Sequence, residues 1–289
     1  MVIKLGIIGY PLAHSLSPDL HVYLLNRLHK DGQYVRYECD ESALPDLMRQ
    51  FAQSGLTGFN VTIPYKKTIM PFLNERSLAT EFIGAVNTVH LKAGEFWGYN
   101  TDCLGFKQAL ERRDVTVKNK AAVVFGAGGA ARAVCFQLLE SGVSALVIFN
   151  RTVPAAEKMA RDLQIRFPSC KIEFQDLSTV EATPQMLEVD LFVNTTSLGM
   201  WPYVDSAPFV FQWDLSNKVV VDVVYNPLRT RFLQIAEDLH AETVDGLDMF
   251  IFQGVEALKI WLNIEGSIDF NYFELRNFLE EKLKSYGTA

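Results

Sequence analysis

Residues 120–142 read KAAVVFGAGGAARAVCFQLLESG, and this stretch decides the fold of the chain around it. A short apolar run typical of a buried strand leads into a glycine-rich turn, and the turn leads into a helix pattern with an apolar face. The turn has the spacing G-x-G-x-x-A through Gly126, Gly128 and Ala131. Strand, glycine turn and helix in this order predict a Rossmann-type domain that binds a dinucleotide, whereas a tight turn without a ligand is the simpler alternative.

The residues of this motif suit a particular cofactor. Gly126 permits the tight turn, Gly128 lets backbone amides approach a pyrophosphate, and the helix N-terminus offers it partial positive charge. The next strand ends FNRT, so Asn150 stands where an acidic residue would bind the ribose of NAD. Arg151 adds a planar cation suited to a 2′-phosphate and Thr152 adds a hydroxyl, which favours NADP. The alternative is that Arg151 is a solvated surface charge.

The rest of the second half alternates strand and helix in the same way. Buried strands are expected at residues 145–149, 190–194 and 218–223, with helices from about Pro154 and Pro227. This alternation predicts an α/β domain with a parallel sheet.

The first hundred residues repeat the alternation. A buried strand is expected at residues 4–9 and further strands at 35–39 and 58–63, with helices from Ser17 and from about Leu44. Residues 88–99 read TVHLKAGEFWGY, and their alternation around Ala93 and Gly94 predicts a hairpin. A first domain with a mostly parallel sheet is therefore predicted.

The chain turns helical again after Asp245. Its last segment, FNYFELRNFLEEKLKSY, is expected to carry one apolar face formed by Phe273, Phe278, Leu279 and Leu283. Because one or two helices cannot stand alone, they are expected to pack back on the first domain. The predicted division is a first, substrate domain of residues 1–103 plus 246–289, and a dinucleotide-binding domain of residues 104–245.

Composition limits the class of protein. The 289 residues are 49% hydrophobic and 21% charged, which excludes intrinsic disorder, and 27 basic against 34 acidic residues give a net charge of −7 that disfavours nucleic acid and anionic membranes. The four cysteines form no Cys-x-x-Cys pair and the five histidines lack metal-ligand spacing, so no metal is expected. No run of about 18 apolar residues occurs. We expect a cytoplasmic protein, monomeric or homodimeric, with a small-molecule partner.

Polar clusters stand beside the predicted elements of the first domain, where ligand groups gather in open α/β sheets. The segment SLS presents Ser15 and Ser17 before a helix, and two hydroxyls with the helix amides could bind a carboxylate. Ser17 is also a good N-cap, with Pro18 at the first helical position, so ordinary capping is the alternative.

Two further clusters suggest proton transfer. In NVTIPYK, Asn60 and Thr62 are expected on one face of a strand, and Lys66 emerges from the loop that follows. In YNTD, Thr101 can cap the next helix, which places the carboxylate of Asp102 at a favourable dipole. Such a carboxylate could orient Lys66, and a lysine can serve as general acid or base for an alcohol. Solvated surface charges are the alternative.

Together the motifs resemble the shikimate dehydrogenase family, including its shikimate/quinate members. The matching segments, in order along nearly the whole chain, are SLSP, NVTIPYK, GAVNT, NTD, GAGGAARA, NRT, NTTSLGM, DVVYNP and GLDMFIFQG. The resemblance implies a two-domain enzyme that interconverts shikimate and 3-dehydroshikimate with NADP(H) in aromatic amino-acid biosynthesis. It also implies that Lys66 and Asp102 are the catalytic pair. His14, which stands beside Ser15, is a second candidate for the proton transfer.

The resemblance carries further residues over by position. For the substrate these are Ser15, Ser17, Thr62, Asn87 and Gln253, with Tyr225 nearby. For the cofactor they are Gly126, Ala127, Gly128, Gly129, Ala130, Asn150, Arg151, Thr152, Thr195, Gly246 and Met249. Neutral donors and acceptors suit a polyhydroxylated ring, because a mismatched hydroxyl would leave a buried polar group unpaired. The simpler alternatives are a solvent-facing Gln253 and a Met249 that only fills the core.

Two positions depart from the family pattern. Ala155 stands where many NADP-using relatives have a second basic residue, so a phosphate is one cation short unless Lys158 or Arg132 helps. Asp248 stands in GLDM where glycine is common, and the sequence offers no account of it. Quinate oxidation with NAD is the nearest alternative function. A non-catalytic ligand-binding regulator on the same fold is the alternative from another class, and the retained catalytic pair argues against it.

Overall fold

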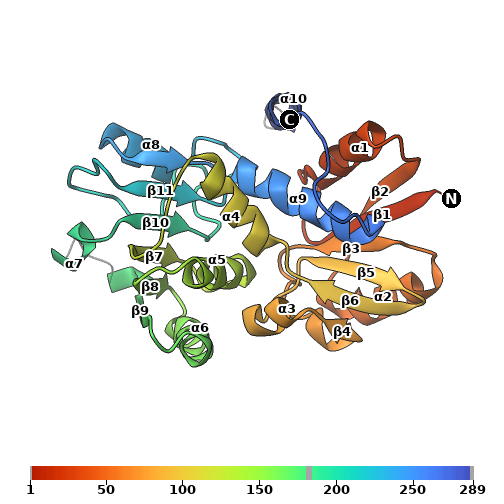
Figure 1. Ribbon diagram of the computed structural model, residues 1–289, viewed down its shortest axis with the longest axis horizontal. Coiled ribbons are helices and arrows are strands. Elements are labelled where there is room, and N and C mark those ends of the chain that lie inside the picture. The colour runs from red at the N-terminus through yellow and green to blue at the C-terminus, as the bar shows by residue number, and fades with distance from the viewer. Residues whose placement is uncertain (1, 180–183, 287–289) are drawn as a thin grey trace. The chain divides into compact units, whose positions relative to one another are not determined.

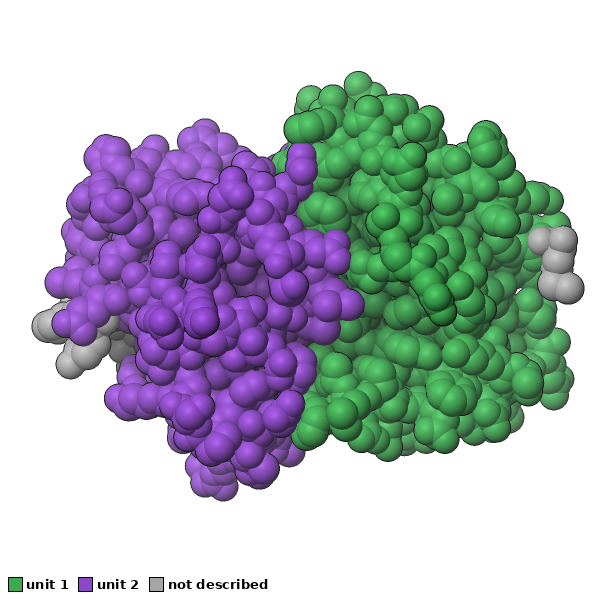
Figure 2. Space-filling view, viewed as in Figure 1, with its two compact units in different colours: residues 1–101, 251–289 green, residues 102–250 purple. Residues whose placement is uncertain are grey.

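The chain forms two compact units in the computed structural model, which describes residues 2–179 and 184–286. Unit 1 contains residues 1–101 and 251–289, and unit 2 contains residues 102–250 (Figure 1 and Figure 2). The sequence prediction placed these divisions after residue 103 and before residue 246. Each unit is built around its own sheet.

Unit 1 holds a six-stranded sheet with the order β2-β1-β3-β5-β6-β4. The strands are β1 (Ile3–Gly9), β2 (Gly32–Glu38), β3 (Gly58–Val61), β4 (Glu75–Arg76), β5 (Thr88–Lys92) and β6 (Glu95–Tyr99). β1 is parallel to β2 and β3, and β4 is parallel to β6, while β5 is antiparallel to β3 and β6. β5 alone opposes the other strands of this sheet, so the predicted mostly parallel sheet is confirmed. Ala93 and Gly94, both with positive φ, turn the expected hairpin between β5 and β6.

The helices of unit 1 pack on this sheet or on one another. They are α1 (Ser17–Arg27), α2 (Leu44–Gln53), α3 (Leu78–Ile83) and α10 (Tyr272–Tyr286), with short 3₁₀ turns at η1 (Glu41–Ala43) and η2 (Met70–Phe72). α2 contributes Leu44, Met48 and Phe51 to a core shared with Phe59 and Val61 of β3. This apolar spacing is the reason that the segment is helical and lies against the sheet.

The C-terminal segment returns to unit 1, as predicted. α9 (Gly246–Leu262) begins in unit 2 and continues from Ile251 in unit 1, and α10 packs against α1. Trp261 of α9 is buried and donates its indole N–H to the carbonyl oxygen of Val89 in β5 (2.9 Å). The tail is thereby part of the core of unit 1.

Unit 2 holds a six-stranded parallel sheet with the order β12-β11-β10-β7-β8-β9. Its strands are β7 (Ala121–Phe125), β8 (Ala145–Asn150), β9 (Lys171–Asp176), β10 (Leu191–Asn194), β11 (Val219–Asp222) and β12 (Glu242–Val244). Counted from β7 and read from β9, this is the 3-2-1-4-5-6 order of Rossmann folds. The order reverses between β7 and β10, and ligands of such sheets bind at that switch point. The predicted Rossmann-type domain is therefore confirmed.

Helices flank this second sheet (Figure 1). They are α4 (Asp102–Arg112), α5 (Gly129–Glu140), α6 (Val153–Arg166), α7 (Pro184–Leu187) and α8 (Arg231–Asp238), with a 3₁₀ turn at η3 (Leu177–Thr179). α4 packs on α5, α6 packs on β8 and β9, and α8 packs on β11 and β12. Aromatic side chains, among them Phe125, Phe192 and Phe232, fill one core of the unit.

One predicted helix cap and one predicted helix start are wrong. Ser17 is the first residue of α1, and the cap position belongs to Leu16, whose side chain makes no cap bond. The helix expected from about Pro227 begins at Arg231, because the hydroxyl of Thr230 accepts the N–H of Leu233 and caps the helix there.

The predicted apolar face of the last helix is also wrong at its start. Phe273 is 68% exposed, whereas α10 buries Leu275, Leu279 and Leu283. Successive positions on a helix are rotated by about 100°, so the stripe that runs through Leu279 and Leu283 passes through Leu275 and leaves Phe273 outside.

Candidate active site

The loops that follow β1 and β3 lie next to each other in unit 1. The N–H of Thr62 donates to the carbonyl oxygen of Ile8 (2.9 Å), and the N–H of Tyr10 donates to that of Ile63 (3.0 Å). Parallel strands end at the same edge of a sheet, so these bonds tie together the segments that carry SLSP and NVTIPYK. The predicted ligand residues Ser15, Thr62 and Lys66 all belong to these two segments.

Ser15 and Ser17 are joined at the start of α1. The N–H of Ser17 donates to the hydroxyl oxygen of Ser15 (3.3 Å), and the carbonyl oxygen of Ser15 accepts from the guanidinium of Arg36 (2.8 Å). Ser17 is buried and Ser15 is half-buried. The two hydroxyls therefore lie close together at the start of α1, and the hydrogen bond from Arg36 of β2 fixes the backbone there.

Lys66 lies in the turn after β3, and its backbone is held on both sides. Its carbonyl oxygen accepts the N–H of Val86 (2.7 Å), and the hydroxyl of the buried Tyr65 donates to the carbonyl oxygen of Cys39 (2.5 Å). The lysine side chain is half-buried. Because Val86 directly precedes Asn87, this bond also places the Lys66 turn beside the start of β5.

Asn87 and Gln253 are brought together although 166 positions separate them. Asn87 is 2% exposed, and its Nδ2 donates to Oε1 of Gln253 (3.2 Å) and to the hydroxyl of Thr101 (2.9 Å). The backbone N–H of Thr101 donates to Oδ1 of Asn87 (2.7 Å). Gln253 is 8% exposed, so it does not face bulk solvent as the simpler alternative held.

From the sequence, Asn60 and Thr101 were placed in polar segments without a ligand role, and His21, Tyr34 and Thr88 were not identified. We define the amide network as the buried polar side chains of unit 1 that are linked through Asn60 and Asn87, namely His21, Tyr34, Asn60, Asn87, Thr88, Thr101 and Gln253. The signal available in the sequence was weak. Polar residues interrupt otherwise apolar strand and helix patterns at Asn60, Thr88 and His21. This pattern indicates that they are buried but does not indicate what they bind.

Asp102 is the first residue of α4 and is 4% exposed. It follows Thr101 of the amide network directly, and it is counted in unit 2 while Lys66 is counted in unit 1. Its carboxylate lies in the first helical turn, where the helix dipole favours negative charge. Its pairing with Lys66 stays a proposal.

The glycine turn of unit 2 lies at the switch point of the Rossmann sheet. Gly126 follows β7 with φ +114°, and a Cβ atom there would lie 2.5 Å from the hydroxyl of Thr195, which follows β10. That hydroxyl donates to the carbonyl oxygen of Phe125 (2.6 Å). A glycine is therefore required at position 126 both by backbone conformation and by space.

Gly128 behaves differently from Gly126. It is the cap residue of α5 with an ordinary negative φ, and a Cβ atom built there would meet no heavy atom within 4 Å. Packing within the protein does not explain this glycine. An open backbone cradle at the N-terminus of a 12-residue helix is the kind of site that receives a dinucleotide phosphate.

The segment after β8 is arranged around Asn150. Its side-chain Nδ2 donates to the carbonyl oxygen of Thr152 (2.9 Å), which fixes the turn before α6. Arg151, in the middle of this turn, is exposed. Its guanidinium is accessible to a phosphate at the carboxyl end of β8, beside the glycine turn that follows β7.

A second buried network lies at the carboxyl ends of β10 and β11. We define the carboxyl network as Asn194, Asp222 and Thr230: Asp222 accepts from Nδ2 of Asn194 (3.0 Å), from the hydroxyl of Thr230 (2.7 Å) and from the N–H of Val224 (2.9 Å). Burial raises the pKa of Asp222 to about 7, although these three donors oppose the rise. The network fixes the loops that contain Thr195 and Tyr225.

Comparison with known proteins gives this arrangement a family. Residues 7–89 match the model described as shikimate dehydrogenase substrate binding domain, and residues 107–197 match the model described as shikimate / quinate 5-dehydrogenase. The shikimate dehydrogenase (NADP(+)) of Carboxydothermus hydrogenoformans is 39% identical over 260 residues, which are 90% of this chain and 91% of that protein. The chain belongs to the shikimate dehydrogenase family.

Solved structures from the shikimate dehydrogenase family share the fold. A shikimate dehydrogenase in complex with NADP+ matches with a TM-score of 0.87 and 35% identity, over 98% of this chain and 96% of that chain. The quinate dehydrogenase from Corynebacterium glutamicum, in complex with NAD, matches with a TM-score of 0.83 and 29% identity, over 97% of this chain and 99% of that chain. Similar folds therefore occur with both cofactors.

The two cations that could replace the missing base at Ala155 are engaged with one carboxylate. Arg132 of α5 and Lys158 of α6 reach the same Asp162, with N···O distances of 3.3 and 2.9 Å. Partial burial alone would raise the pKa of Asp162, but Lys158 and Arg132 outweigh it and hold the pKa below its ordinary value. Arg132 and Lys158 are therefore both paired with Asp162, and neither replaces the base missing at Ala155 as an unpaired cation would.

The aspartate in GLDM, which departs from the shikimate dehydrogenase pattern, has a partner in unit 2. Asp248 is fully buried in the first turn of α9, and its carboxylate lies 3.4 Å from Nε of Arg113, just beyond α4. Asp245 lies 4.0 Å from the same guanidinium. The extra carboxylate is therefore matched by a cation that ties the start of α9 to the end of α4.

Three further residues assigned from the family resemblance take part in packing within the protein. A Cβ atom at Gly246 would lie 2.4 Å from the carbonyl oxygen of Val223, so close packing alone requires this glycine. Met249 is buried, and the ring of Tyr225 packs on Phe250 with a centroid distance of 4.7 Å. Their roles toward a ligand stay proposals.

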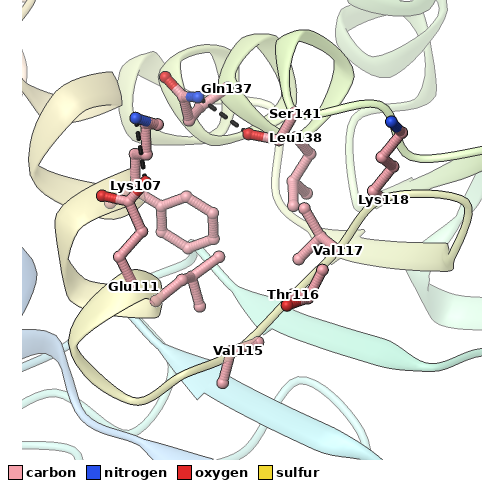
Figure 3. Close-up of a pocket in the computed structure, with 11 residues that line it drawn as sticks. Lys107, Glu111, Val115, Thr116, Val117, Lys118, Gln137, Leu138 and Ser141 are labelled. Atoms are coloured by element: carbon pink, nitrogen blue, oxygen red, sulfur yellow. Dashed lines mark hydrogen bonds and ion pairs between the residues drawn. The ribbon is translucent and has the colours of Figure 1, made fainter.

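A separate pocket of unit 2 contains none of the residues assigned to shikimate dehydrogenase function (Figure 3). Its volume is about 310 Å³, and it lies between α4, residues 115–118 and the C-terminal end of α5. Lys107 and Glu111 form an ion pair there (3.0 Å). Gly128 caps the opposite end of α5, so this pocket is not the phosphate cradle.

Residues 2–179 and 184–286 contain neither a metal-binding cluster nor a membrane-spanning helix. Within these ranges no group of three or more His, Cys, Asp and Glu side chains is arranged to hold a metal ion. In the same part of the chain, no helix combines the length and apolar character needed to cross a bilayer.

Proposed function

We propose that this chain is an NADP-dependent shikimate dehydrogenase that reversibly oxidises shikimate to 3-dehydroshikimate in aromatic amino-acid biosynthesis. The observation that carries the proposal is the buried cluster that joins Asn87 to Gln253 beside the turn of Lys66. Neutral donors and acceptors, together with a lysine amine as the proton carrier, suit the oxidation of one hydroxyl on a polyhydroxylated ring. The names of the relatives support the same activity.

Proton transfer is assigned to Lys66. In the reducing direction its protonated amine donates a proton to the oxygen that was the substrate carbonyl, and in the oxidising direction the neutral amine accepts the hydroxyl proton. Asp102 is proposed as its partner carboxylate because it stands in the family motif NTD, buried at a helix start. The substrate is assigned to Ser15, Ser17, Thr62, Asn87 and Gln253, with Tyr225 nearby.

The cofactor is assigned to unit 2, whose residues fit NADP. The open cradle at Gly128 and the start of α5 would receive the pyrophosphate, and Arg151, with Asn150 and Thr152, would receive the 2′-phosphate. Thr195, Gly246 and Met249 complete the proposed set. When bound, NADP(H) supplies or accepts the hydride.

The test is a comparison of initial rates with shikimate and quinate, each with NADP and with NAD. We expect the largest kcat/KM for shikimate with NADP. A larger value for quinate with either cofactor would replace this proposal with a quinate dehydrogenase. Absence of turnover in all four mixtures would contradict an oxidoreductase of this class.

Use of NAD is the second candidate, and one observation favours it. Arg132 and Lys158 are held by Asp162, so Arg151 stands without a second cation in the turn that begins α6.

We predict that Arg151→Ala raises the KM for NADP about 10- to 100-fold, since a hydrogen bond to a charged group contributes about 1.5–3 kcal/mol, and leaves the KM for NAD within about twofold.

Arg161→Ala is the matched control for this prediction, because Arg161 is an exposed α6 residue that pairs with Glu157. It should change neither KM. Equal effects of Arg151→Ala on NADP and NAD would show that the guanidinium does not contact a 2′-phosphate. The expected cytoplasmic location and a monomeric or homodimeric state stay predictions.

A further inference from the structure

Asn60 lies at the centre of the amide network. Its Nδ2 donates to the backbone carbonyl of Asn87 (3.1 Å) and to the hydroxyl of Thr88 (3.2 Å). Its Oδ1 accepts from the hydroxyl of Tyr34 (2.6 Å) and lies 3.1 Å from Nε2 of His21. One buried amide therefore connects the backbone of Asn87 with two side chains that the proposed mechanism does not use.

The backbone decides which way this amide faces. A carbonyl oxygen can only accept, so the atom of Asn60 that faces the Asn87 carbonyl must be nitrogen, and Oδ1 must face Tyr34 and His21. Nε2 of His21 therefore carries the ring proton and donates it. Nδ1 of His21 is buried and makes no hydrogen bond within the described residues. Burial lowers the pKa of His21 to about 3, against the hydrogen bond with Asn60, so the ring is neutral.

A second backbone group decides the orientation of the next two amides. The N–H of Thr101 can only donate, so it must face Oδ1 of Asn87, and Nδ2 of Asn87 then faces Gln253. The facing atom of Gln253 must accept and is Oε1. Nε2, the donor end of Gln253, is therefore turned to the other side.

His21 also packs against the helix that carries Gln253. Its ring stacks on Tyr34 with a centroid distance of 4.7 Å and contacts Trp261 of α9 at 5.0 Å. A Cβ atom at Gly254, next to Gln253, would lie 3.6 Å from Cε1 of His21. His21 and Tyr34 thus reach Gln253 both through the hydrogen bonds of Asn60 and Asn87 and through direct packing on α9.

We propose that His21 and Tyr34 are positioning residues for the substrate site. They hold Oδ1 of Asn60, and Asn60 in turn holds the backbone carbonyl of Asn87 and the hydroxyl of Thr88, which donates to Oδ1 of Asn87 (3.0 Å). Through these bonds they fix the position of the side-chain amides of Asn87 and Gln253 that are assigned to the substrate. The inference rests on the proposed function, because it assigns these two amides to the substrate.

The two donors to Asn60 predict a distinctive pattern of mutational effects. Either one can still donate to Oδ1 when the other is removed, so a single loss should have a small effect, whereas loss of both leaves a buried carbonyl oxygen without a donor and weakens the hold on the Asn60 amide. Tyr34→Phe and His21→Leu should each raise the KM for shikimate about threefold, and the double variant about 100-fold. His21→Gln retains a donor and should restore the KM toward the wild-type value.

The experiment measures kcat and KM for shikimate, KM for NADP and the melting temperature for each variant. We expect a selective rise in the shikimate KM with kcat and the NADP KM within about twofold, because a ground-state binding interaction is lost. Tyr37→Phe is the control. It lies in the same strand on the opposite face, where its ring packs on Phe51 at 4.7 Å.

Three outcomes would overturn the inference. The single variants could leave the shikimate KM unchanged, the NADP and shikimate KM values could rise together with a falling melting temperature, or His21→Gln could behave like His21→Leu. The first two would mark the network as only structural. If the double variant does not fold, Tyr34→Phe and the two His21 variants decide the matter.

A wild-type enzyme inactive on shikimate would overturn the proposed function as well, whereas an active one with unaffected variants would overturn this inference alone.

Discussion

The amide network of unit 1 and the carboxyl network of unit 2 are both sets of buried, hydrogen-bonded polar side chains, yet they are built for different tasks. In the amide network the side chains are neutral amides, hydroxyls and one neutral imidazole, and two of them, Asn87 and Gln253, are proposed ligands. In unit 2 Asp222 holds loops in place, while the proposed ligand contacts come from the glycine turn. One site is made of side chains and the other largely of backbone.

The difference follows from the ligands proposed for each unit. A ring with several hydroxyls must be read atom by atom, which requires side chains with a defined donor and acceptor orientation. A pyrophosphate is a diffuse anion that backbone N–H groups at a helix start bind well. Side-chain substitutions should therefore damage function in unit 1, whereas unit 2 should be most sensitive where the backbone itself is altered.

The largest effect is expected from the side chain of Lys66. We predict that Lys66→Ala lowers kcat about 10²- to 10⁴-fold, because it removes the proposed proton carrier, and leaves NADP binding unchanged. Steady-state rates and cofactor titration would measure this. Lys67→Ala, at the exposed neighbouring position, is the control, and His14→Ala tests the alternative proton carrier. A kcat within tenfold of wild type for Lys66→Ala would break the assignment.

The matching test of unit 2 changes the backbone. Gly126→Ala should lower the free energy of unfolding by about 2–3 kcal/mol, because φ is +114° and the added Cβ would meet Thr195 at 2.5 Å. The KM for NADP should rise with it. Gly128→Ala is the contrast, since the new methyl meets nothing within 4 Å; it should weaken NADP binding without lowering the melting temperature. A wild-type melting temperature for Gly126→Ala would contradict the steric argument.

The neutral imidazole of unit 1 predicts a loss of stability in acid. The pKa of His21 is about 3 in the folded chain, below its ordinary 6.5, so only the unfolded state takes up a proton as pH falls from 6.5. This group should therefore remove about 2 kcal/mol of stability between pH 6.5 and pH 5. Urea unfolding at the two pH values should show that loss in wild type and a smaller one in His21→Gln. His240→Gln, at an exposed site, is the control, and equal losses in all three proteins would contradict the prediction.

The buried carboxyl group of Asp222 in unit 2 predicts the opposite change of stability with pH. The pKa of Asp222 is about 7 in the folded chain, above its ordinary 3.8, so the unfolded state releases its proton first and stability falls as pH rises between these values. The expected loss from this group is about 1.4 kcal/mol per pH unit, for example from pH 5 to pH 6. Asp222→Asn should remove this dependence of stability on pH, whereas Asp205→Asn, at an exposed position, should not. Parallel stability curves for wild type and Asp222→Asn would refute it.

Much of the fold was predictable because hydrophobic period and glycine turns are local signals. The strands around GAGG and the hairpin at Ala93 and Gly94 are examples. β9 (Lys171–Asp176) was not predicted, because this edge strand is mostly exposed and its alternating pattern contains only two apolar residues, Ile172 and Phe174. The start of α8 was misplaced because Pro227 and Thr230 both signal a helix start, and the hydrogen bonds of Thr230 with Asp222 and Leu233 decide between them.

The site was predictable only as a set of polar segments. Ser15, Thr62 and Lys66 stand near strand ends, which sequence reasoning can locate. The role of Asn60 in orienting Asn87, and the ion pair of Asp248 with Arg113, depend on which residues meet in space. No local pattern carries that information.

The sequence by itself determined the Rossmann motif, the open turn for a phosphate and the alternation of strand and helix, because each depends on residues within a few positions of one another. Only the tertiary structure decided that Gln253 meets Asn87 and that Asp222 is buried with a pKa of about 7. These properties depend on distances and on burial, and residues far apart in the chain acquire both only when the sheets and helices pack.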